Sequence, residues 1–253
     1  MKLATWNVNS LKVRLPQLLD WLRREQPDVA CLQETKLEDS RFPVEEIRAA
    51  GYEAVYAGQK TYNGVAILCR TPPGEALAGV SGYTDSQQRV LSVSVGGMRV
   101  VCAYVPNGQS VDSDKYRYKL EWLAAFTAWL KTVLARHQRL AVLGDFNIAP
   151  EARDVHDPRA WEGQVLFSPP ERQAFRALLD IGLSDSLRLV EQGDRLFTWW
   201  DYRMNAFRRG MGLRIDHILL SQPLAQQCKT VRIDTPMRAA ERPSDHAPVI
   251  AEL

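Results

Sequence analysis

The sequence predicts an α/β protein in which two β-sheets pack face to face and helices cover their outer sides. Apolar runs of strand length are frequent along the chain, whereas segments with helical periodicity are few. One pair of strands is joined by Gly96-Gly97, because two glycines accept the positive φ angles of a tight hairpin turn. Hairpins and scarce helices argue against a regular strand–helix–strand repeat, so two packed sheets account best for the pattern.

Each expected element follows from its own pattern. Apolar runs bounded by turn residues predict strands, namely Lys2–Val8, Asp28–Gln33, Glu53–Tyr56, Gly64–Cys69, Arg89–Val95, Arg99–Val105, Leu140–Gly144, Leu213–Leu220, Lys229–Ile233 and Ala247–Leu253. Apolar residues at helical spacing predict helices, namely Arg14–Glu25, Val44–Ala50, Asp114–Arg136 and Pro170–Ile181. Ser168, followed by Pro169 and Pro170, has the form of a helix cap with proline in the first turn.

Composition and charge narrow the class of protein. A hydrophobic content of 45% and a charged content of 25% are ordinary for a soluble globular enzyme. The net charge of +2 excludes a histone-like coat for nucleic acid, so a polyanion must bind at a local patch. The N-terminus lacks a signal-peptide core, no run reaches transmembrane length, and the cysteines show no C-x-x-C spacing. We therefore expect a cytoplasmic location, reduced buried thiols and no membrane partner. Length alone allows one large domain or two small ones, but no linker divides the chain, so we expect one domain over residues 1–253.

Polar residues recur at the ends of the apolar runs. A strand carries its terminal residues to the rim of its sheet, so groups from distant parts of the chain can meet there. These groups are Asn7, Glu34, Asp145, Asn147, Asp216, Asp245 and His246. Carboxylates, amides and one imidazole suit a hard cation and a phosphate, and no Cys/His cluster suits zinc. Glu34, an acid that ends an otherwise apolar strand, is the best candidate for a metal ligand, with an ordinary surface glutamate as the alternative.

Period-two alternation predicts how these side chains are oriented. Asp145 and Asn147 lie two residues apart and should face the same ligand. Asp245 and His246 are adjacent and should diverge, so His246 needs a carboxylate from another segment. Asp216 is the natural partner, and a carboxylate–imidazole pair favours the imidazolium form that suits a phosphate contact.

Residues 194–214 combine basic and aromatic side chains. The aromatic residues are Phe197, Trp199, Trp200, Tyr202 and Phe207, and the arginines include Arg203, Arg208 and Arg209. Arginines can hold backbone phosphates while aromatic rings stack on bases and sugars, so this segment is predicted to bind DNA. The alternative is a solvated basic hairpin over ordinary core aromatics.

Two further loops carry candidate contacts. Tyr104 ends a strand, and its phenol can donate either to a phosphate or, if buried, to a protein acceptor. Asn107 follows nearby and is a further candidate for contact with DNA. Tyr62 and Asn63 lie in a polar loop tip that could touch DNA, although loop tips are polar in most proteins.

Short motifs run in a fixed order along nearly the whole chain. They are WNVNSL at 6–11, LQETK at 32–36, YNGVAIL at 62–68, LGDFNIAP at 143–150, WWDYR at 199–203, GLRIDHIL at 212–219 and PSDHAP at 243–248. In this order they resemble the exonuclease III branch of the endonuclease/exonuclease/phosphatase superfamily. The resemblance implies a four-layered αββα sandwich of two mixed sheets flanked by helices. It also implies a Mg²⁺-dependent DNA repair nuclease in which Mn²⁺ can substitute.

The resemblance assigns roles by position. Glu34 resembles the metal ligand, with Asn7 and Asp245 near it, and Asp145 resembles the residue that activates the attacking water or serves the leaving oxygen. Asn147 and Tyr104 resemble phosphate-positioning groups, and His246, paired with Asp216, resembles the histidine that contacts the phosphate. Trp199 and Leu213 resemble the walls of a pocket for an extrahelical sugar.

The implied substrate is double-stranded DNA with nicks, blocked 3′ ends or abasic sites, cleaved by a monomer. A relative that acts on inositol or lipid phosphates is the runner-up, which the arginine-rich segment disfavours. A catalytically silent DNA-binding relative would require loss of Glu34, Asp145 or His246, and all three are present.

The loop at 150–172 holds five acidic residues and three arginines. We expect this loop to favour processing of 3′ ends over incision of a continuous strand, because it cannot neutralise backbone phosphates as a basic loop would. The alternative is that the loop folds away from DNA.

Overall fold

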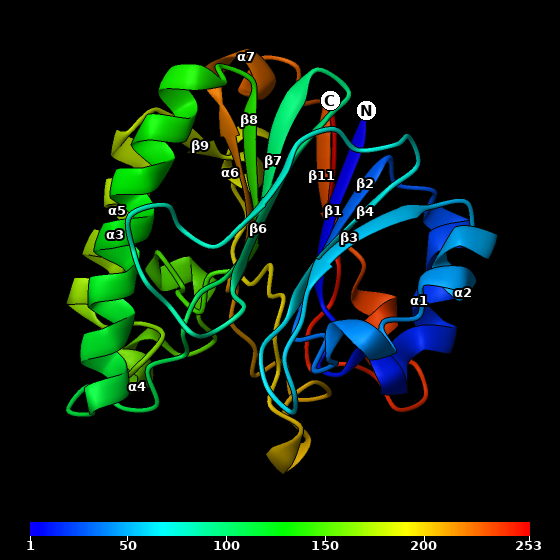
Figure 1. Ribbon diagram of the computed structural model, residues 1–253. Coiled ribbons are helices and arrows are strands. Elements are labelled where there is room, and N and C mark those ends of the chain that lie inside the picture. Colours follow the sequence, from blue (N-terminus) through cyan, green and yellow to red (C-terminus); the bar gives the residue numbers. More distant parts are fainter.

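The computed structural model describes residues 1–253 and contains two mixed six-stranded sheets (Figure 1). The first sheet has the order β11-β12-β1-β2-β4-β3, with bounds Thr230–Ile233, Val249–Glu252, Lys2–Asn7, Val29–Gln33, Val65–Cys69 and Glu53–Ala57. The second has the order β5-β6-β7-β8-β10-β9, with bounds Ala76–Ala78, Val90–Val95, Met98–Tyr104, Leu140–Asp145, Asp216–Ser221 and Leu183–Asp185. The predicted pair of packed sheets is confirmed.

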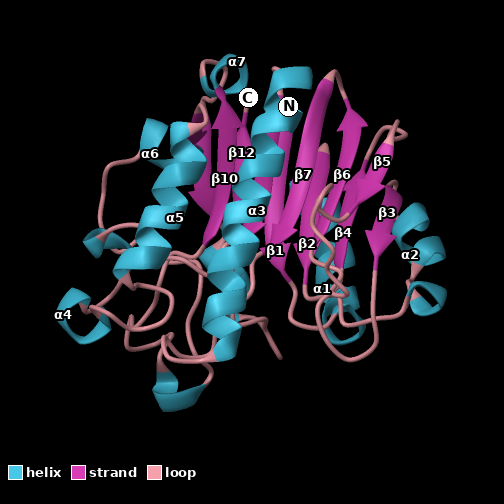
Figure 2. Cartoon of the chain, turned by 60° about the vertical axis from the view of Figure 1, so that its left-hand side comes forward, coloured by secondary structure: helices cyan, strands magenta, loops and turns pink.

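Helices cover the outer side of each sheet (Figure 2). The first sheet is covered by α1 (Leu11–Glu25) and α2 (Val44–Ala49), and the second by α3 (Asp114–Arg136) and α5 (Pro169–Asp180). Short α-helices lie in the connections, namely α4 (Pro158–Trp161), α6 (Ser186–Val190) and α7 (Gln222–Ala225). Single 3₁₀ turns are η1 (Asp39–Arg41), η2 (Ala152–Asp154), η3 (Arg203–Asn205) and η4 (Thr235–Ala239). None of the helices combines the length and the apolar character needed to cross a bilayer.

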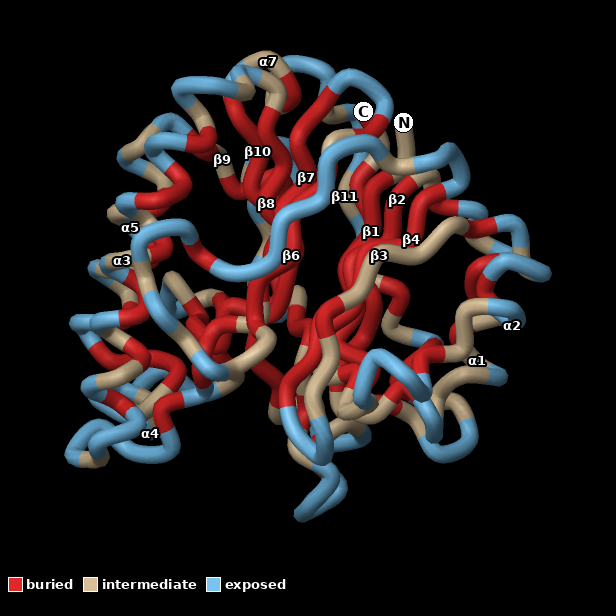
Figure 3. The backbone as a smooth tube through the Cα atoms, in the orientation of Figure 1, coloured by how far each residue is buried: buried red, intermediate tan, exposed pale blue.

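Three apolar layers hold the sandwich together. The central layer joins the facing sides of the two sheets, and the outer layers seal each sheet against its helices. Strand residues are mostly buried, whereas exposed residues lie on loops, on outward helix faces and on the edge strands β5 and β11 (Figure 3). Cys31, Cys69 and Cys102 lie in the central layer as free thiols, as the sequence predicted.

Strand direction brings the polar strand ends to one rim. β1 and β2 are parallel neighbours, and so are β7 and β8, so their carboxyl ends share a side. β12 is antiparallel to β1 and β10 is antiparallel to β8, so these two strands begin where their neighbours end. In the β8–β10 ladder Asp145 and Asp216 are direct partners. The rim therefore collects residues from both ends of the chain.

The element boundaries differ from expectation in a few places. The strand predicted from Leu213 begins instead at Asp216, because Leu213 bridges to Trp199 and the Thr198 hydroxyl accepts the backbone N–H groups of Ile215 and Asp216. β5 and β9 were not predicted, because three residues at a sheet edge are too short to show alternation. The hairpin at Gly96 and Gly97 is confirmed, since both glycines have positive φ angles and Val95 pairs with Met98.

Candidate active site

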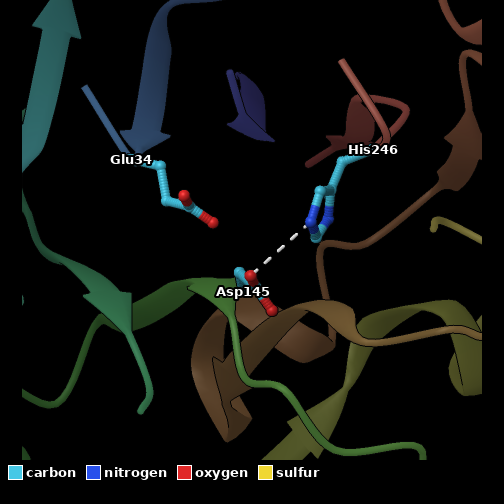
Figure 4. Close-up of side chains that lie close together, drawn as sticks. All are labelled: Glu34, Asp145 and His246. Carbon is cyan, nitrogen blue, oxygen red and sulfur yellow. Dashed lines mark ion pairs between the residues drawn. The ribbon is translucent and has the colours of Figure 1, made fainter. Parts of the chain in front are cut away.

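Three side chains with metal-binding chemistry converge where the two sheets meet (Figure 4). Glu34 follows β2 and His246 precedes β12, both in the first sheet, whereas Asp145 ends β8 in the second. One ligand atom from each lies within 4.8 Å of the other two. The His246 Nε2 atom is 3.8 Å from Oδ2 of Asp145. The site is therefore assembled across the seam between the sheets.

Asn7 joins the two carboxylates. Its buried amide nitrogen donates to Glu34 Oε1 at 2.8 Å and to Asp145 Oδ2 at 2.9 Å. Its amide oxygen accepts the backbone N–H of Asn9 at 2.9 Å. In this orientation Asn7 holds the two carboxylates together, and its amide oxygen, which accepts from Asn9, keeps one lone pair for a further donor or a cation.

Asn147 lies next to Asp145 on the same rim, and the expectation that both side chains face one ligand stays a prediction. Its backbone N–H donates to Asp145 Oδ1 at 2.9 Å, and its side-chain nitrogen donates to the carbonyl of Val105 at 3.0 Å. Its side-chain oxygen accepts from Asn107 at 3.0 Å. The residue has a positive φ of 50°, a conformation that asparagine tolerates better than most residues.

His246 pairs with Asp216, which confirms the inference from strand periodicity. The His246 Nδ1 atom lies 2.8 Å from Asp216 Oδ2, and both side chains are buried. Burial opposes protonation of the imidazole, but Asp216 and then Asp145 outweigh it and raise the pKa of His246 to about 10. The imidazole is therefore protonated at neutral pH, with its Nε2 side facing Asp145.

The surroundings of Asp145 disfavour the ionised form of its carboxyl group. Its side chain is almost fully buried, and this burial raises its pKa to about 7, although the His246 imidazolium opposes the shift. The neighbouring carboxylates of Asp216 and Glu34 act in the same direction as burial. A divalent cation beside Asp145 would favour its ionised form.

Asp245 diverges from His246, again as predicted. Its carboxylate accepts hydrogen bonds from Asn9 Nδ2 at 2.9 Å and from Trp199 Nε1 at 3.0 Å, outside the group of three. Although burial raises its pKa, His246, Asn9 and Trp199 together lower it below the usual value. Asp245 therefore fixes the ring of Trp199 beside the site.

Tyr104 stands beside the carboxylates with Arg89 over its ring. The Arg89 guanidinium carbon is 4.8 Å from the ring centroid. Burial, followed by the charges of Glu34 and Asp145, raises the pKa of Tyr104 well above its usual range. The phenol therefore stays protonated and keeps its capacity to donate a hydrogen bond.

The predicted DNA contacts divide into outward and inward groups. Arg203, Arg208 and Arg209 are exposed, although Arg203 pairs with Asp201 at 2.6 Å. Tyr62 is 68% exposed. A cavity of about 710 Å³ beside Tyr104 is lined in part by Tyr62, Asn63 and Asn107. Of the lining residues, the exposed Tyr62 and Asn107 can reach a ligand at the rim.

Leu213 and Asn63 face inward more than their sequence positions suggested. Leu213 is fully buried and packs behind Trp199, which is itself only half-buried. The Asn63 amide nitrogen donates to Gln59 at 3.2 Å and to Gln87 at 3.0 Å. Only Trp199 of the predicted pocket walls is accessible, because Leu213 fills the space behind it.

Lys36 is a site residue that the sequence reasoning missed. Its ammonium lies 2.8 Å from Glu34 Oε2 and donates to Asn9 Oδ1 at 2.5 Å. Strand alternation could not have indicated it, because β2 ends at Gln33 and both Glu34 and Lys36 have positive φ angles.

Comparison with known proteins agrees with this geometry. Residues 4–246 match the model of the Endonuclease/Exonuclease/phosphatase family. Exodeoxyribonuclease III of Haemophilus influenzae is 37% identical over the full length of both chains. NExo from Neisseria, a 3′ phosphatase solved with a product DNA hairpin, is 48% identical with a TM-score of 0.98 over 100% of this chain and 99% of its own. An AP endonuclease from Archaeoglobus fulgidus is 38% identical with a TM-score of 0.96 over the same shares. The chain therefore belongs to the Endonuclease/Exonuclease/phosphatase family, as an exodeoxyribonuclease III-like enzyme.

Proposed function

We propose that this enzyme removes nucleotides and blocking phosphates from 3′ ends of duplex DNA with the help of Mg²⁺, and that Mn²⁺ can replace Mg²⁺. The observation that carries the proposal is the convergence of Glu34, Asp145 and His246 at the seam between the sheets. Similarity to a 3′ phosphatase that was solved with product DNA supports the substrate class.

The donor set fits a hard divalent cation. Glu34 offers a half-buried carboxylate, Asp145 offers a second, and the cluster contains no cysteine. Mg²⁺ typically binds one or two carboxylates and completes its shell with water and substrate phosphate. When bound, the cation would polarise a phosphoryl oxygen and neutralise developing charge. Lys36, which holds Glu34 at 2.8 Å, would have to share this carboxylate.

The residues of this chain supply the remaining chemistry. Asp145 is placed to accept the proton of an attacking water or to serve the leaving oxygen, and Asn7 and Asn147 hold its two oxygens. His246, kept protonated and oriented by Asp216, donates to a phosphate oxygen. Tyr104 offers its phenolic O–H as a further donor. Such preorganised donors stabilise the charge of the transition state.

The exposed arginines should supply salt-dependent affinity for DNA. Changing both Arg208 and Arg209 to Ala should lower the slope of log affinity against log salt by about 0.9 for each phosphate that the protein no longer neutralises. The measurement is a series of DNA-binding titrations at several salt concentrations. Arg23→Ala, on the outer side of α1, is the control and should leave the slope unchanged. Equal slopes for all three proteins would mean that Arg208 and Arg209 face solvent only.

The loop at 150–172 is less acidic on its outer surface than its composition indicates. Asp154 is buried in an ion pair with Arg214, and Glu171 is buried against Lys119. Leu166 and Phe167 pack inward, beneath Leu213. The exposed residues from Glu162 to Gln164 include no basic side chain, and the nearby Arg172 is already paired with Glu162 at 2.7 Å, so the centre of the loop offers phosphates no free positive charge. Preference for 3′ ends over continuous strands therefore remains part of the proposal.

Paired substrates test the proposed function. We expect a nicked duplex with a 3′-phosphate to be processed faster than an otherwise identical duplex with an internal abasic analogue is cut. Both reactions should stop in EDTA and return with Mg²⁺. Equal rates on the two duplexes would contradict the proposal that the loop at 150–172 favours 3′ ends. Full activity in EDTA would contradict the proposed dependence on Mg²⁺.

A further inference from the structure

A lysine lies fully buried on the core side of α3. The ammonium of Lys119 donates to the backbone carbonyls of Asn147 at 2.7 Å and Asn107 at 3.1 Å, and its third partner is the carboxylate of Glu171. An ammonium has three donors, so every one of them is used. No solvent reaches the side chain of either Lys119 or Glu171. The pair therefore acts on neighbouring protein groups alone.

Glu171 secures the other side of the pair. One carboxylate oxygen also accepts the backbone N–H of Leu166 at 3.0 Å. The other accepts from the backbone and the hydroxyl of Ser168, at 3.1 and 2.5 Å. These contacts form the N-terminal cap of α5, and they anchor the end of the loop at 150–172 against Lys119.

The two carbonyls that Lys119 binds belong to residues at the catalytic rim. Asn107 donates to the side chain of Asn147, and the backbone of Asn147 donates to Asp145. Asn147 keeps a positive φ, and such conformations persist when surrounding contacts determine them. Lys119 binds the carbonyl of this residue directly, so it restrains the peptide that aims Asn147.

A gain in the free energy of unfolding does not explain why a fully buried ion pair occupies this position. Removing two charges from water costs as much as, or more than, their attraction returns, and apolar replacements of such pairs are often neutral. A leucine at position 119 would fill the space but would leave two carbonyls of the rim without a donor. We propose that Lys119 is a positioning residue for the hydrolytic reaction, because its ammonium holds the Asn107 and Asn147 loops in the orientation that the reacting phosphate requires. This inference rests on the proposed function.

The test separates positioning from simple support of the fold. Lys119→Met alone leaves Glu171 as an unpaired buried charge and is expected to lower Tm. The double variant Lys119→Met with Glu171→Gln removes both charges and should recover most of that Tm. If Lys119 positions the asparagines, kcat on the 3′-phosphate nicked duplex should fall about 10²-fold in both variants while KM changes little. Glu171→Gln alone leaves Lys119 as an unpaired buried charge, so Tm should fall as in Lys119→Met. The lysine still reaches the two carbonyls, so kcat measured well below that Tm should stay close to wild type.

Lys131→Met, on the exposed side of the same helix, is the matched control and should change neither Tm nor kcat. Recovery of kcat together with Tm in the double variant would show that the pair only supports the fold. Side-chain amide NMR signals of Asn107 and Asn147 provide a readout without DNA or metal, and they should shift or broaden in the double variant but not in Lys131→Met. Unchanged signals would overturn the inference. If the wild type itself lacks nuclease activity, the proposed function fails and the NMR comparison still decides the role of Lys119.

Discussion

Asp145→Asn is expected to reduce turnover by about 10²–10⁴-fold, because the amide cannot accept the proton that a carboxylate accepts. The substitution preserves shape and leaves an oxygen for the backbone N–H of Asn147, but the amide nitrogen that replaces Oδ2 can no longer accept from Asn7, a loss that removal of the buried charge should offset. The folded protein should not lose stability. Burial raises the pKa of Asp145, which means that the ionised carboxylate is disfavoured at this site, and asparagine removes that charge.

Two measurements on the same sample check this expectation. The rate on a nicked duplex with a 3′-phosphate should fall, while Tm in the absence of metal should stay the same or rise. Asp180→Asn, at the exposed end of α5, is the matched control and should leave both unchanged. A turnover within a few-fold of wild type would mean that Asp145 serves packing rather than chemistry.

His246→Asn is expected to give the second large loss, of about 10²–10³-fold in kcat, because it removes a charged donor aimed at the phosphate. Asp216→Asn should cost less, about 10²-fold at most, because the imidazole remains but loses the carboxylate that orients it and keeps it protonated. Affinity for DNA should change little in either variant, since neither side chain is exposed enough to form a large contact.

The double variant provides the sharper measurement. If Asp216 acts only through His246, then the variant with both substitutions should be no slower than His246→Asn alone. Losses in kcat that simply multiply would show that Asp216 has a separate function in the reaction. Circular dichroism and Tm of each variant establish that the comparison concerns folded proteins.

Much of the fold and site could be predicted because strand ends are visible in sequence. Glu34 and Asp145 each end an apolar run, whereas the ladder that pairs Asp145 directly with Asp216 was not predicted. The pairing of Asp216 with His246 was predicted, because alternation along a strand excluded Asp245 as the partner. The predicted features depend on local periodicity, which the sequence records directly.

What could not be predicted depends on contacts between distant segments. Nothing in the sequence indicates that Leu213 is sealed behind Trp199, or that Asn63 is occupied by two glutamines. The orientation of the Asn7 amide is decided by two carboxylates that lie 27 and 138 residues away. Lys119 resembles any other lysine on a long helix until Glu171 is seen opposite it.

Because the site lies at the seam between the two sheets, it can form only late in the synthesis of the chain. Glu34 and Asp145 belong to different sheets, and His246 precedes β12, the last strand in chain order. β12 inserts between β1 and β11, so it joins strands from opposite ends of the sequence. A growing chain therefore carries acidic groups at the rim well before it carries the imidazole. The group of Glu34, Asp145 and His246 is complete only when the first sheet has closed, so under the proposed mechanism we expect a partly synthesised or partly folded chain not to cleave DNA.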